Sequence, residues 1–229
     1  MEDRALAQVL EQMEDEEVEA VRLQFTDING TLKSVAVTPA RLRSLGEEPL
    51  FVDGSFLAGR DGEEGVELLL KPDLSTCSIL PWKGYTGKVA RLYCSLCQED
   101  GTPFPEDSRA VLAEAERRAE AEGYRLSVRP ECEFFLFHTD DDGQPTVLTH
   151  ERAGYLEASP VDLGESARRE MVHTLEEMGV TVEASRHEIS PGQHGIDLGR
   201  MGLLEAADGI ATFRFVVRTV AKRHGLHAT

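Results

Sequence analysis

The stretch "PECEFFLF", residues 130–137, places two carboxylates in front of a run of apolar side chains. Side chains alternate between the two faces of a β-strand, so Glu131 and Glu133 project from one face, and Phe135 and Phe137 continue that row. Burying a bare carboxylate is costly. The stretch therefore predicts a strand whose carboxylates face either water, as in a solvated edge strand, or a cation.

A second segment, "VEASRHEIS", adds Glu183 and Glu188 to the carboxylates of the first. Carboxylates that converge from neighbouring strands repel one another unless a multivalent cation neutralises them. Clusters of oxygen ligands suit Mg²⁺ or Mn²⁺, which are the usual partners of nucleotide phosphates. A magnesium or manganese site is therefore one interpretation of these strands, and a solvated edge is the other.

Length and charge limit the class of protein. The 229 residues, 41% of them hydrophobic, are enough for one large or two small globular domains. The net charge of -18 opposes binding to nucleic acid and to anionic lipid. The sequence shows neither an apolar run of membrane-spanning length nor a basic signal segment, so we expect a cytoplasmic protein without membrane or nucleic-acid partners.

The first hundred residues read as a small α+β unit. An N-terminal helix is followed by alternating segments around Asn29-Gly30, a dipeptide typical of β-hairpin turns. Short strands are predicted at "LLLKPDL" and "KVARLYCSL". Cys94 and Cys97 form a C-x-x-C within a predicted strand, where positions i and i+3 face opposite sides. We interpret them as core thiols; a joint metal site would require the strand to end at Cys97.

The remainder reads as a second α+β unit after the turn-rich "QEDGTPFPEDS". Asp107 and Ser108 are the candidate N-caps for the helix that follows. Strands are predicted over 125–139 and 180–198, and a helix over 203–225. Asp162 and Glu165 have capping-box spacing before a further helix. The stripe of that helix is Ala167, Met171, Leu175 and Met178. The fold class predicted is mixed α+β, without regular β-α-β alternation.

Eight collinear motifs resemble the N-terminal half of bacterial glutamine synthetases of type I. They are "FTDINGTLKSV", "VDGS", "PDLST", "GTPFPEDSR", "PECEFFLF", "AGYLEASPVDLGESARREMV", "EEMGVTVEASRHEISPGQHGIDL" and "RTVAKRHGLHAT". The resemblance runs from about Val18 to the last residue. It implies a β-grasp domain over 16–101, followed by the first part of the catalytic domain, an antiparallel sheet with helices, over 107–229.

The resemblance also implies an activity. Enzymes of this family bind ATP and glutamate beside two divalent cations, Mg²⁺ or Mn²⁺, and transfer the γ-phosphoryl group of ATP to the side-chain carboxylate of glutamate. Ammonia then displaces phosphate and glutamine is formed. The family's enzymes are ring-shaped homo-oligomers, usually dodecamers of two stacked hexamers, with active sites between neighbouring subunits. The chain is thus expected to be a glutamate–ammonia ligase, with glutamate, ammonia and ATP as its partners.

The same resemblance assigns the metal ligands. Glu131 would hold the ion nearer to the nucleotide, and Glu133 and Glu188 would hold the ion nearer to glutamate. Because the family gives the coordinating role to the glutamate beside His187, we interpret His187 and His194 as structural residues rather than as a metal pair.

Three residues outside the metal set also acquire roles by resemblance. Glu183 would contact ATP, and Tyr155 would line the nucleotide site. Asp53 would reach into the adjacent subunit and help to deprotonate ammonium. Near Asp53 the sequence departs from the family, with Phe56 where the family has a serine and Arg60 where an aromatic residue is common.

Two further departures bear on activity. Gly195 stands where the family has a glutamate that ligates the glutamate-side ion, and the family continues beyond "HGLHAT" into its remaining metal ligands, glutamate-binding loop and catalytic arginines. We therefore expect the isolated chain to be inactive. The alternatives to glutamine formation are a non-catalytic or regulatory relative of the family and a γ-glutamyl amide ligase that uses another amine.

Overall fold

A computed structural model of the chain describes residues 2–57, 65–82 and 87–229. Two compact units divide the chain, Met1–Arg125 and Leu126–Thr229, and each is described by itself. The predicted domain limits, 16–101 and 107–229, stay a prediction, because the compact units reflect contacts rather than family domains. Within the described residues, no helix is long and apolar enough to cross a membrane.

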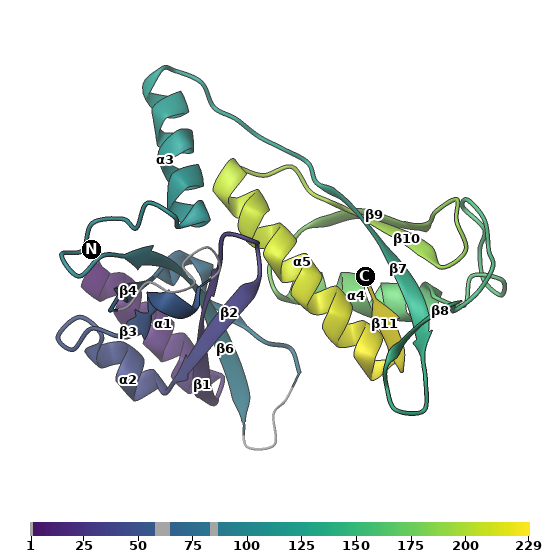
Figure 1. Ribbon diagram of the computed structural model, residues 1–229, viewed down its shortest axis with the longest axis horizontal. Helices are drawn as coiled ribbons and strands as arrows, with labels where there is room; N and C mark the ends of the chain where they lie inside the picture. The colour runs from purple at the N-terminus through teal and green to yellow at the C-terminus, as the bar shows by residue number, and fades with distance from the viewer. Residues whose placement is uncertain (1, 58–64, 83–86) are drawn as a thin grey trace. The chain divides into compact units, whose positions relative to one another are not determined.

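The first unit is built on a mixed sheet with the strand order β2-β1-β6-β4-β3, and β5 pairs with β6 (Figure 1). β1 and β2 are antiparallel, whereas β1 and β6 are parallel. The strands are β1 (Val18–Thr26), β2 (Leu32–Val37), β3 (Phe51–Asp53), β4 (Glu67–Pro72), β5 (Ser78–Ile79) and β6 (Lys88–Cys97). β6 lies between β1 and β4, and its residues are mostly buried.

The hairpin predicted at Asn29-Gly30 is confirmed as the connection between β1 and β2. Gly30 has a φ of 70°, a left-handed conformation that glycine adopts without steric cost. The buried Asp27 side chain accepts hydrogen bonds from the backbone N–H groups of Asn29 and Thr31, at 3.0 and 2.8 Å. The turn is therefore held by its own residues.

Helices and short 3-10 turns complete the first unit. They are α1 (Glu2–Asp15), α2 (Pro39–Ser44), η1 (Gly54–Phe56), η2 (Leu74–Thr76) and α3 (Ser108–Ala121). Asp107 is the N-cap of α3, as predicted, and its carboxylate accepts a hydrogen bond from the N–H of Arg109. The same carboxylate accepts one from the N–H of Leu96 in β6, at 2.9 Å. One side chain thus fixes the start of the helix against the sheet.

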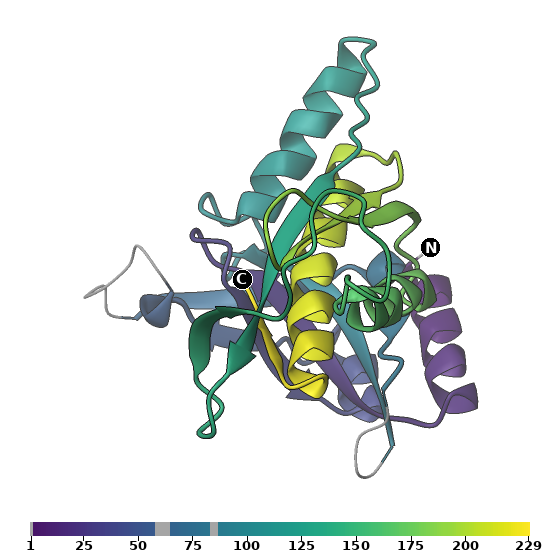
Figure 2. The same cartoon turned by 90° about the vertical axis from the view of Figure 1, so that its right-hand side faces the viewer.

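The second unit is an antiparallel sheet with the order β11-β7-β10-β9, and β8 pairs with β7. The strands are β7 (Glu131–Thr139), β8 (Pro145–Thr149), β9 (Val182–His187), β10 (Gln193–Leu198) and β11 (Leu226–Ala228). Helices α4 (Glu165–Glu177) and α5 (Leu203–Arg223) lie together on one side of this sheet (Figure 2). The alternate residues of β7 and β10 that are buried, Phe134, Leu136, Ile196 and Leu198, belong to the core of this unit. The other face of these two strands is free of helices from this unit, and the predicted α+β class is confirmed.

Three local predictions for this unit were wrong. The strand predicted over 125–139 begins only at Glu131. The segment 180–198 is not one strand but two, β9 and β10, which pair as a hairpin. Asp162 does not cap α4: the N-cap is Gly164, without a side-chain hydrogen bond, and Asp162 forms an ion pair with Arg168 instead. Arg168 of α4, six positions along the chain, pairs with this carboxylate in place of the backbone N–H groups. The predicted stripe of α4 is confirmed, since Ala167, Met171, Leu175 and Met178 are all buried.

The cysteines behave as core thiols, as predicted. Cys94 and Cys97 are buried in β6, and all four cysteines are free. Burial raises the pKa of the Cys94 thiol to about 12, so it stays protonated at neutral pH. A protonated, inaccessible thiol is a poor metal ligand.

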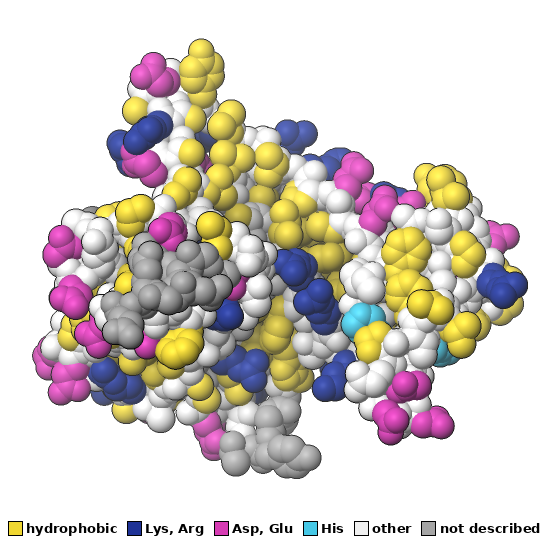
Figure 3. Space-filling model, in the orientation of Figure 1, with side chains coloured by type: hydrophobic (Ala, Val, Ile, Leu, Met, Phe, Trp, Pro, Cys, Tyr) yellow, Lys and Arg dark blue, Asp and Glu magenta, His cyan; other side chains and the backbone are white. Residues whose placement is uncertain are grey.

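Acidic side chains gather at the tip of the hairpin between β7 and β8, in the lower right of Figure 3. Asp140, Asp141 and Asp142 are all exposed there. Asp140 closes its own turn, because its carboxylate accepts hydrogen bonds from the N–H groups of Asp142 and Gln144. The carboxylates of this turn face solvent, and they are separate from those at the start of β7.

Candidate functional site

One face of the second sheet carries the acidic residues singled out from the sequence. In the strand register Gly195 of β10 lies opposite Glu133 of β7 and opposite Arg186 of β9, and Asp197 lies opposite Glu131. Residues opposite one another in a sheet project from the same face. We call the face that bears these five residues the carboxylate face; it is the one that α4 and α5 do not cover.

The two carboxylates of β7 are exposed, which answers the burial problem raised by the sequence. The Glu133 carboxylate accepts a hydrogen bond from Nε2 of Gln193, at 2.6 Å. Further along the same row, the half-buried rings of Phe135 and Phe137 stack with their centroids 5.9 Å apart. Glu131 and Glu133 therefore present oxygen atoms to solvent beside a partly exposed aromatic surface.

Glu188 has a different environment, because Arg186 lies against it. The Arg186 Nε atom is 2.7 Å from Oε1 of Glu188, and its Nη1 donates a hydrogen bond to Oδ2 of Asp197 at 2.5 Å. The side chains of Arg186, Glu188 and Asp197 are 22%, 9% and 18% exposed. The hydrogen bond to Asp197, together with the charges of both acids, raises the pKa of Arg186. A permanent cation thus bridges two largely buried carboxylates.

Gly195 has no side chain, and the Glu188 carboxylate, paired with Arg186, occupies the space that this leaves. A Cβ atom at position 195 would lie 2.4 Å from Oε1 of Glu188 and 3.5 Å from Cζ of Arg186. The first distance is far below van der Waals contact. Any side chain at position 195 would therefore force the Glu188 carboxylate out of its present position.

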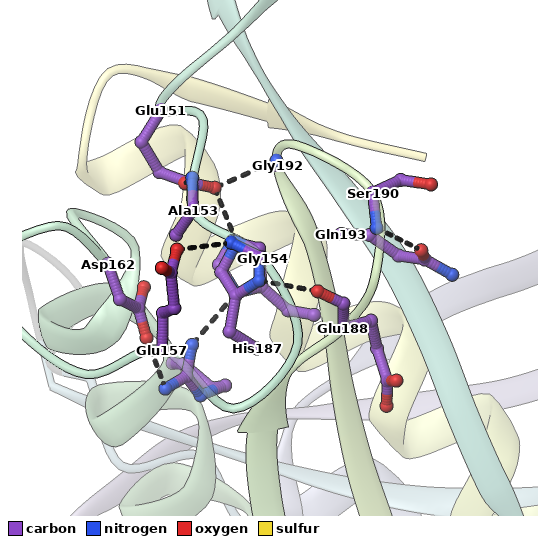
Figure 4. Close-up of polar contacts among 12 residues, drawn as sticks. Glu151, Ala153, Gly154, Glu157, Asp162, His187, Glu188, Ser190, Gly192 and Gln193 are labelled. Atoms are coloured by element: carbon purple, nitrogen blue, oxygen red, sulfur yellow. Dashed lines mark hydrogen bonds and ion pairs between the residues drawn. The ribbon is translucent and has the colours of Figure 1, made fainter.

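Behind the hairpin, His187 and Glu151 form a buried pair (Figure 4). His187 Nε2 lies 2.7 Å from Oε1 of Glu151, and its Nδ1 lies 2.7 Å from the carbonyl oxygen of Glu188. Both ring nitrogens face acceptors, so the geometry calls for an imidazolium. Burial works against the charge, but the hydrogen bonds to Glu151 and to the carbonyl outweigh it and raise the pKa of His187. Glu151 also accepts hydrogen bonds from the N–H groups of Ala153 and Gly192.

His194 belongs to a second buried group with Arg168 and Asp162. Arg168 donates from Nη1 to Nδ1 of His194 at 2.8 Å and from Nη2 to Oδ2 of Asp162 at 2.7 Å. Arginine has no acceptor, so Nδ1 of His194 must be the acceptor and the ring is neutral. Burial, and then the positive charge of Arg168, lower the pKa of His194 to about 4. The pKa values of the two histidines, whose ring centroids lie 4.9 Å apart, are thus shifted in opposite directions.

Ligand atoms of Glu151, His187 and His194 lie within 4.8 Å of one another, close enough for a metal ion. The hydrogen bonds leave few ligand atoms for a metal ion. Both nitrogens of His187 face acceptors, and Nδ1 of His194 accepts from Arg168. A protonated ring nitrogen cannot ligate a metal. The contacts therefore favour the interpretation of both histidines as structural, and the sequence offered no sign of their partner Glu151.

The two residues expected to contact the nucleotide lie at exposed positions of the second unit. Tyr155 is 58% exposed on the loop before α4, and the N–H of the next residue, Leu156, donates to the carbonyl oxygen of His187. Glu183 forms an ion pair with Arg129, 2.7 Å apart, with about two fifths of each side chain exposed. The backbone of the buried His187 thus anchors the loop that carries Tyr155.

Asp53 lies in the first unit, as the N-cap of η1. Its Oδ1 accepts hydrogen bonds from both the hydroxyl and the N–H of Ser55, at 2.5 and 2.9 Å. These bonds, the hydroxyl first, lower the pKa of the exposed Asp53 carboxyl. Phe56 beside it is 81% exposed, whereas Arg60 lies outside the described residues. Asp53 therefore offers a fixed negative charge near neutral pH.

Comparison with known proteins identifies two family domains along the chain. Residues 17–99 match the family model described as the glutamine synthetase β-grasp domain, and residues 105–229 match the glutamine synthetase catalytic domain. Glutamine synthetase of Clostridium saccharobutylicum is 48% identical over 93% of this chain and 48% of its own length. That of Staphylococcus epidermidis is 46% identical over 94% and 49%. The chain thus spans about half the length of these relatives.

Solved structures show the same relation. The GmaS/ADP complex matches with a TM-score of 0.84 and 25% identity, over 96% of this chain and 50% of that one. Plasmodium falciparum glutamine synthetase matches with a TM-score of 0.85 and 21% identity, over 98% and 50%, and supports the fold alone. The matches to both family domains agree with the β-grasp and catalytic assignments made from the sequence.

Proposed function

Because the chain belongs to the glutamine synthetase family, we propose that it carries part of the machinery of an ATP-dependent ligase, which joins ammonia to the side-chain carboxylate of glutamate. The observation that carries the proposal is the carboxylate face, where Glu131 and Glu133 present exposed oxygen atoms within a family catalytic domain. Phosphoryl transfer depends on positioning of the phosphates and on neutralisation of their charge. Exposed carboxylates would ligate the divalent ion that serves both purposes.

The residues of the carboxylate face fit a divalent ion unequally. Glu131 is exposed and would hold the ion nearer to ATP. Glu133 is also exposed, whereas Glu188, its proposed partner at the glutamate-side ion, is buried against Arg186, and Gly195 offers no third ligand. A bound Mg²⁺ or Mn²⁺ neutralises phosphate charge during transfer. The first ion position thus fits the proposal, and the second fits poorly.

The remaining residues bind and orient substrates in this proposal. Glu183 contacts ATP and Tyr155 lines the nucleotide site from a loop that the His187–Glu151 pair anchors. Asp53 holds a carboxylate that attracts ammonium and assists the loss of its proton. Its lowered pKa makes Asp53 a weak base but keeps its negative charge. The carboxylate thus contributes through its charge.

The proposal extends to assembly and location. We propose that the complete enzyme is a ring-shaped homo-oligomer, a dodecamer as in the family, and that it is cytoplasmic. The family membership and the acidic composition support this. Gly195 favours a second candidate function, a non-catalytic or regulatory relative. The exposed Phe56 beside Asp53 favours a third, a γ-glutamyl amide ligase that uses another amine.

A phosphate-release assay tests the proposal. The chain alone, supplied with ATP, glutamate and ammonia, is expected to release no phosphate above background, because it spans about half of its relatives. Co-expressed with a polypeptide that supplies the family's remaining half, it is expected to release phosphate in proportion to glutamine formed. Glu131→Ala should abolish this activity, whereas Glu170→Ala, which removes a half-buried carboxylate on α4, should not.

Three outcomes separate the candidates. A stable but inactive complex of the two halves would favour the non-catalytic relative. Activity that requires methylamine or ethylamine in place of ammonia would favour the amide ligase. Full activity of Glu131→Ala would contradict the role given to the carboxylate face.

A further inference from the structure

We propose that the Arg186 guanidinium takes the place of the divalent ion expected between Glu133 and Glu188, so that Glu188 ligates no metal in this chain. The inference deepens the proposed function and rests on it only for the expectation that an ion belongs at this position. It concerns the number of divalent ions at the carboxylate face, one at Glu131 rather than two.

The first argument is the charge that Arg186 already supplies to Glu188. A carboxylate that is only 9% exposed needs a paired positive charge. Arg186 has its Nε atom 2.7 Å from Oε1, and a guanidinium stays charged at every physiological pH. Magnesium and manganese lie about 2.1 Å from a ligand oxygen, so an ion on this oxygen would lie within about 5 Å of Nε. Two cations so close repel each other. The Arg186 guanidinium, which is covalently attached to the chain, therefore excludes the metal ion.

The second argument is the glycine at position 195. Gly195 does not have a positive φ, so its backbone conformation does not require glycine. A glycine inside a strand often marks a close approach by another group, and here that group is the Glu188 carboxylate, 2.4 Å from where a Cβ would lie. The absence of a side chain at 195 and the pairing of Arg186 with Glu188 therefore belong to one arrangement. Glycine at position 195, in place of the glutamate of the family, both removes a metal ligand and makes room for the ion pair between Arg186 and Glu188.

The third argument is that Arg186 pairs with two acids, so that neither is available to a metal ion. The Arg186 guanidinium pairs with Oε1 of Glu188 and with Oδ2 of Asp197, and Oδ1 of Asp197 has no hydrogen-bond partner among the described residues. If the guanidinium were removed, two largely buried carboxylates with uncommitted oxygen atoms would remain. Such a pair attracts a divalent cation. Arg186 thus occupies a latent metal position.

Mn²⁺ binding to the 229-residue chain, followed by electron paramagnetic resonance, tests the proposal without reference to activity. We expect wild type and Glu188→Gln to bind Mn²⁺ with affinities within about twofold of each other. Arg186→Gln should bind at least about tenfold more tightly than wild type, a change of the size that single groups around a metal produce. Arg186→Gln combined with Glu188→Gln should lose that gain.

The matched control is Arg223→Gln. Arg223 also forms an ion pair with a glutamate, Glu170, at 2.8 Å in the same unit, and its replacement changes the net charge equally. Its Mn²⁺ affinity should stay within about twofold of wild type. A gain as large as that of Arg186→Gln would mean that net charge alone explains the binding, and would overturn the proposal.

Thermal unfolding in Mn²⁺ and in EDTA covers the case in which Arg186→Gln folds poorly. If a divalent ion can replace the guanidinium, Mn²⁺ should raise the unfolding midpoint of Arg186→Gln by more than it raises the midpoints of wild type and of Arg186→Gln/Glu188→Gln, in which only the ion at Glu131 contributes. The proposal is overturned if Glu188→Gln weakens Mn²⁺ binding of the otherwise wild-type chain tenfold or more, or if Mn²⁺ binds and stabilises Arg186→Gln no more than wild type. Failure of the ligase assay would leave all of these results interpretable.

Discussion

The neutral, buried His194 should make the protein lose stability as the pH falls below about 6.5. Its pKa is about 4 in the folded chain, against an ordinary value of 6.5. Because the folded-state pKa is lowered, the unfolded chain binds a proton at a pH where the folded chain does not. The stabilisation is complete above the unfolded pKa and is lost as the pH falls toward 4.

The size of the effect follows from the shift. A difference of one pKa unit corresponds to about 1.4 kcal/mol, so the full loss below pH 4 is about 3 kcal/mol. Between pH 7 and pH 5 the loss is about 2 kcal/mol. His187 acts with the opposite sign: its pKa is raised, so its contribution is complete below about 6.5 and is lost as the pH rises through the folded value.

Comparison with His194→Asn isolates the effect. Asparagine can place Oδ1 near the position of Nδ1 and so keep an acceptor for Arg168, but it does not titrate. The free energy of unfolding, from urea denaturation at pH 7, 6 and 5, should fall by about 2 kcal/mol more in wild type than in the variant over this range. His173→Asn, a replacement of an exposed histidine on α4, should parallel wild type. Parallel curves for wild type and His194→Asn would refute the reasoning.

Three further predictions concern stability and share one measurement, the urea midpoint at pH 7. Gly164→Ala should destabilise the chain by about 1–3 kcal/mol, because its Cβ would lie 2.4 Å from Cε1 of the buried His194 ring; an unchanged midpoint would show that the ring can move freely. Leu175→Ala, at a fully buried position of α4, should cost about 2–5 kcal/mol, whereas Val147→Ala, 90% exposed, should stay within about 0.5 kcal/mol. Gly30→Ala should cost about 1–2 kcal/mol because φ is 70°, and a neutral result would mean that the turn rearranges.

Local patterns in the sequence were enough to predict most of the elements. Alternation around Asn29-Gly30 predicted the β1–β2 hairpin, and Asp107 was identified as the cap of α3, because turn and cap preferences depend on residues within a few positions of each other. Strand alternation likewise placed Glu131 and Glu133 on one face. These features were predictable because each rests on short-range backbone geometry.

Only the tertiary structure decided what surrounds the candidate ligands. Arg186 was not singled out in the sequence, and its contacts with Glu188 and Asp197 depend on the register of the β9–β10 hairpin. Glu151 lies 36 positions before His187 in the chain, yet the two form a buried pair. A carboxylate in a strand reads the same whether its partner is water, a metal or an arginine. The choice among them depends on packing between segments that are distant in sequence, and no local pattern encodes it.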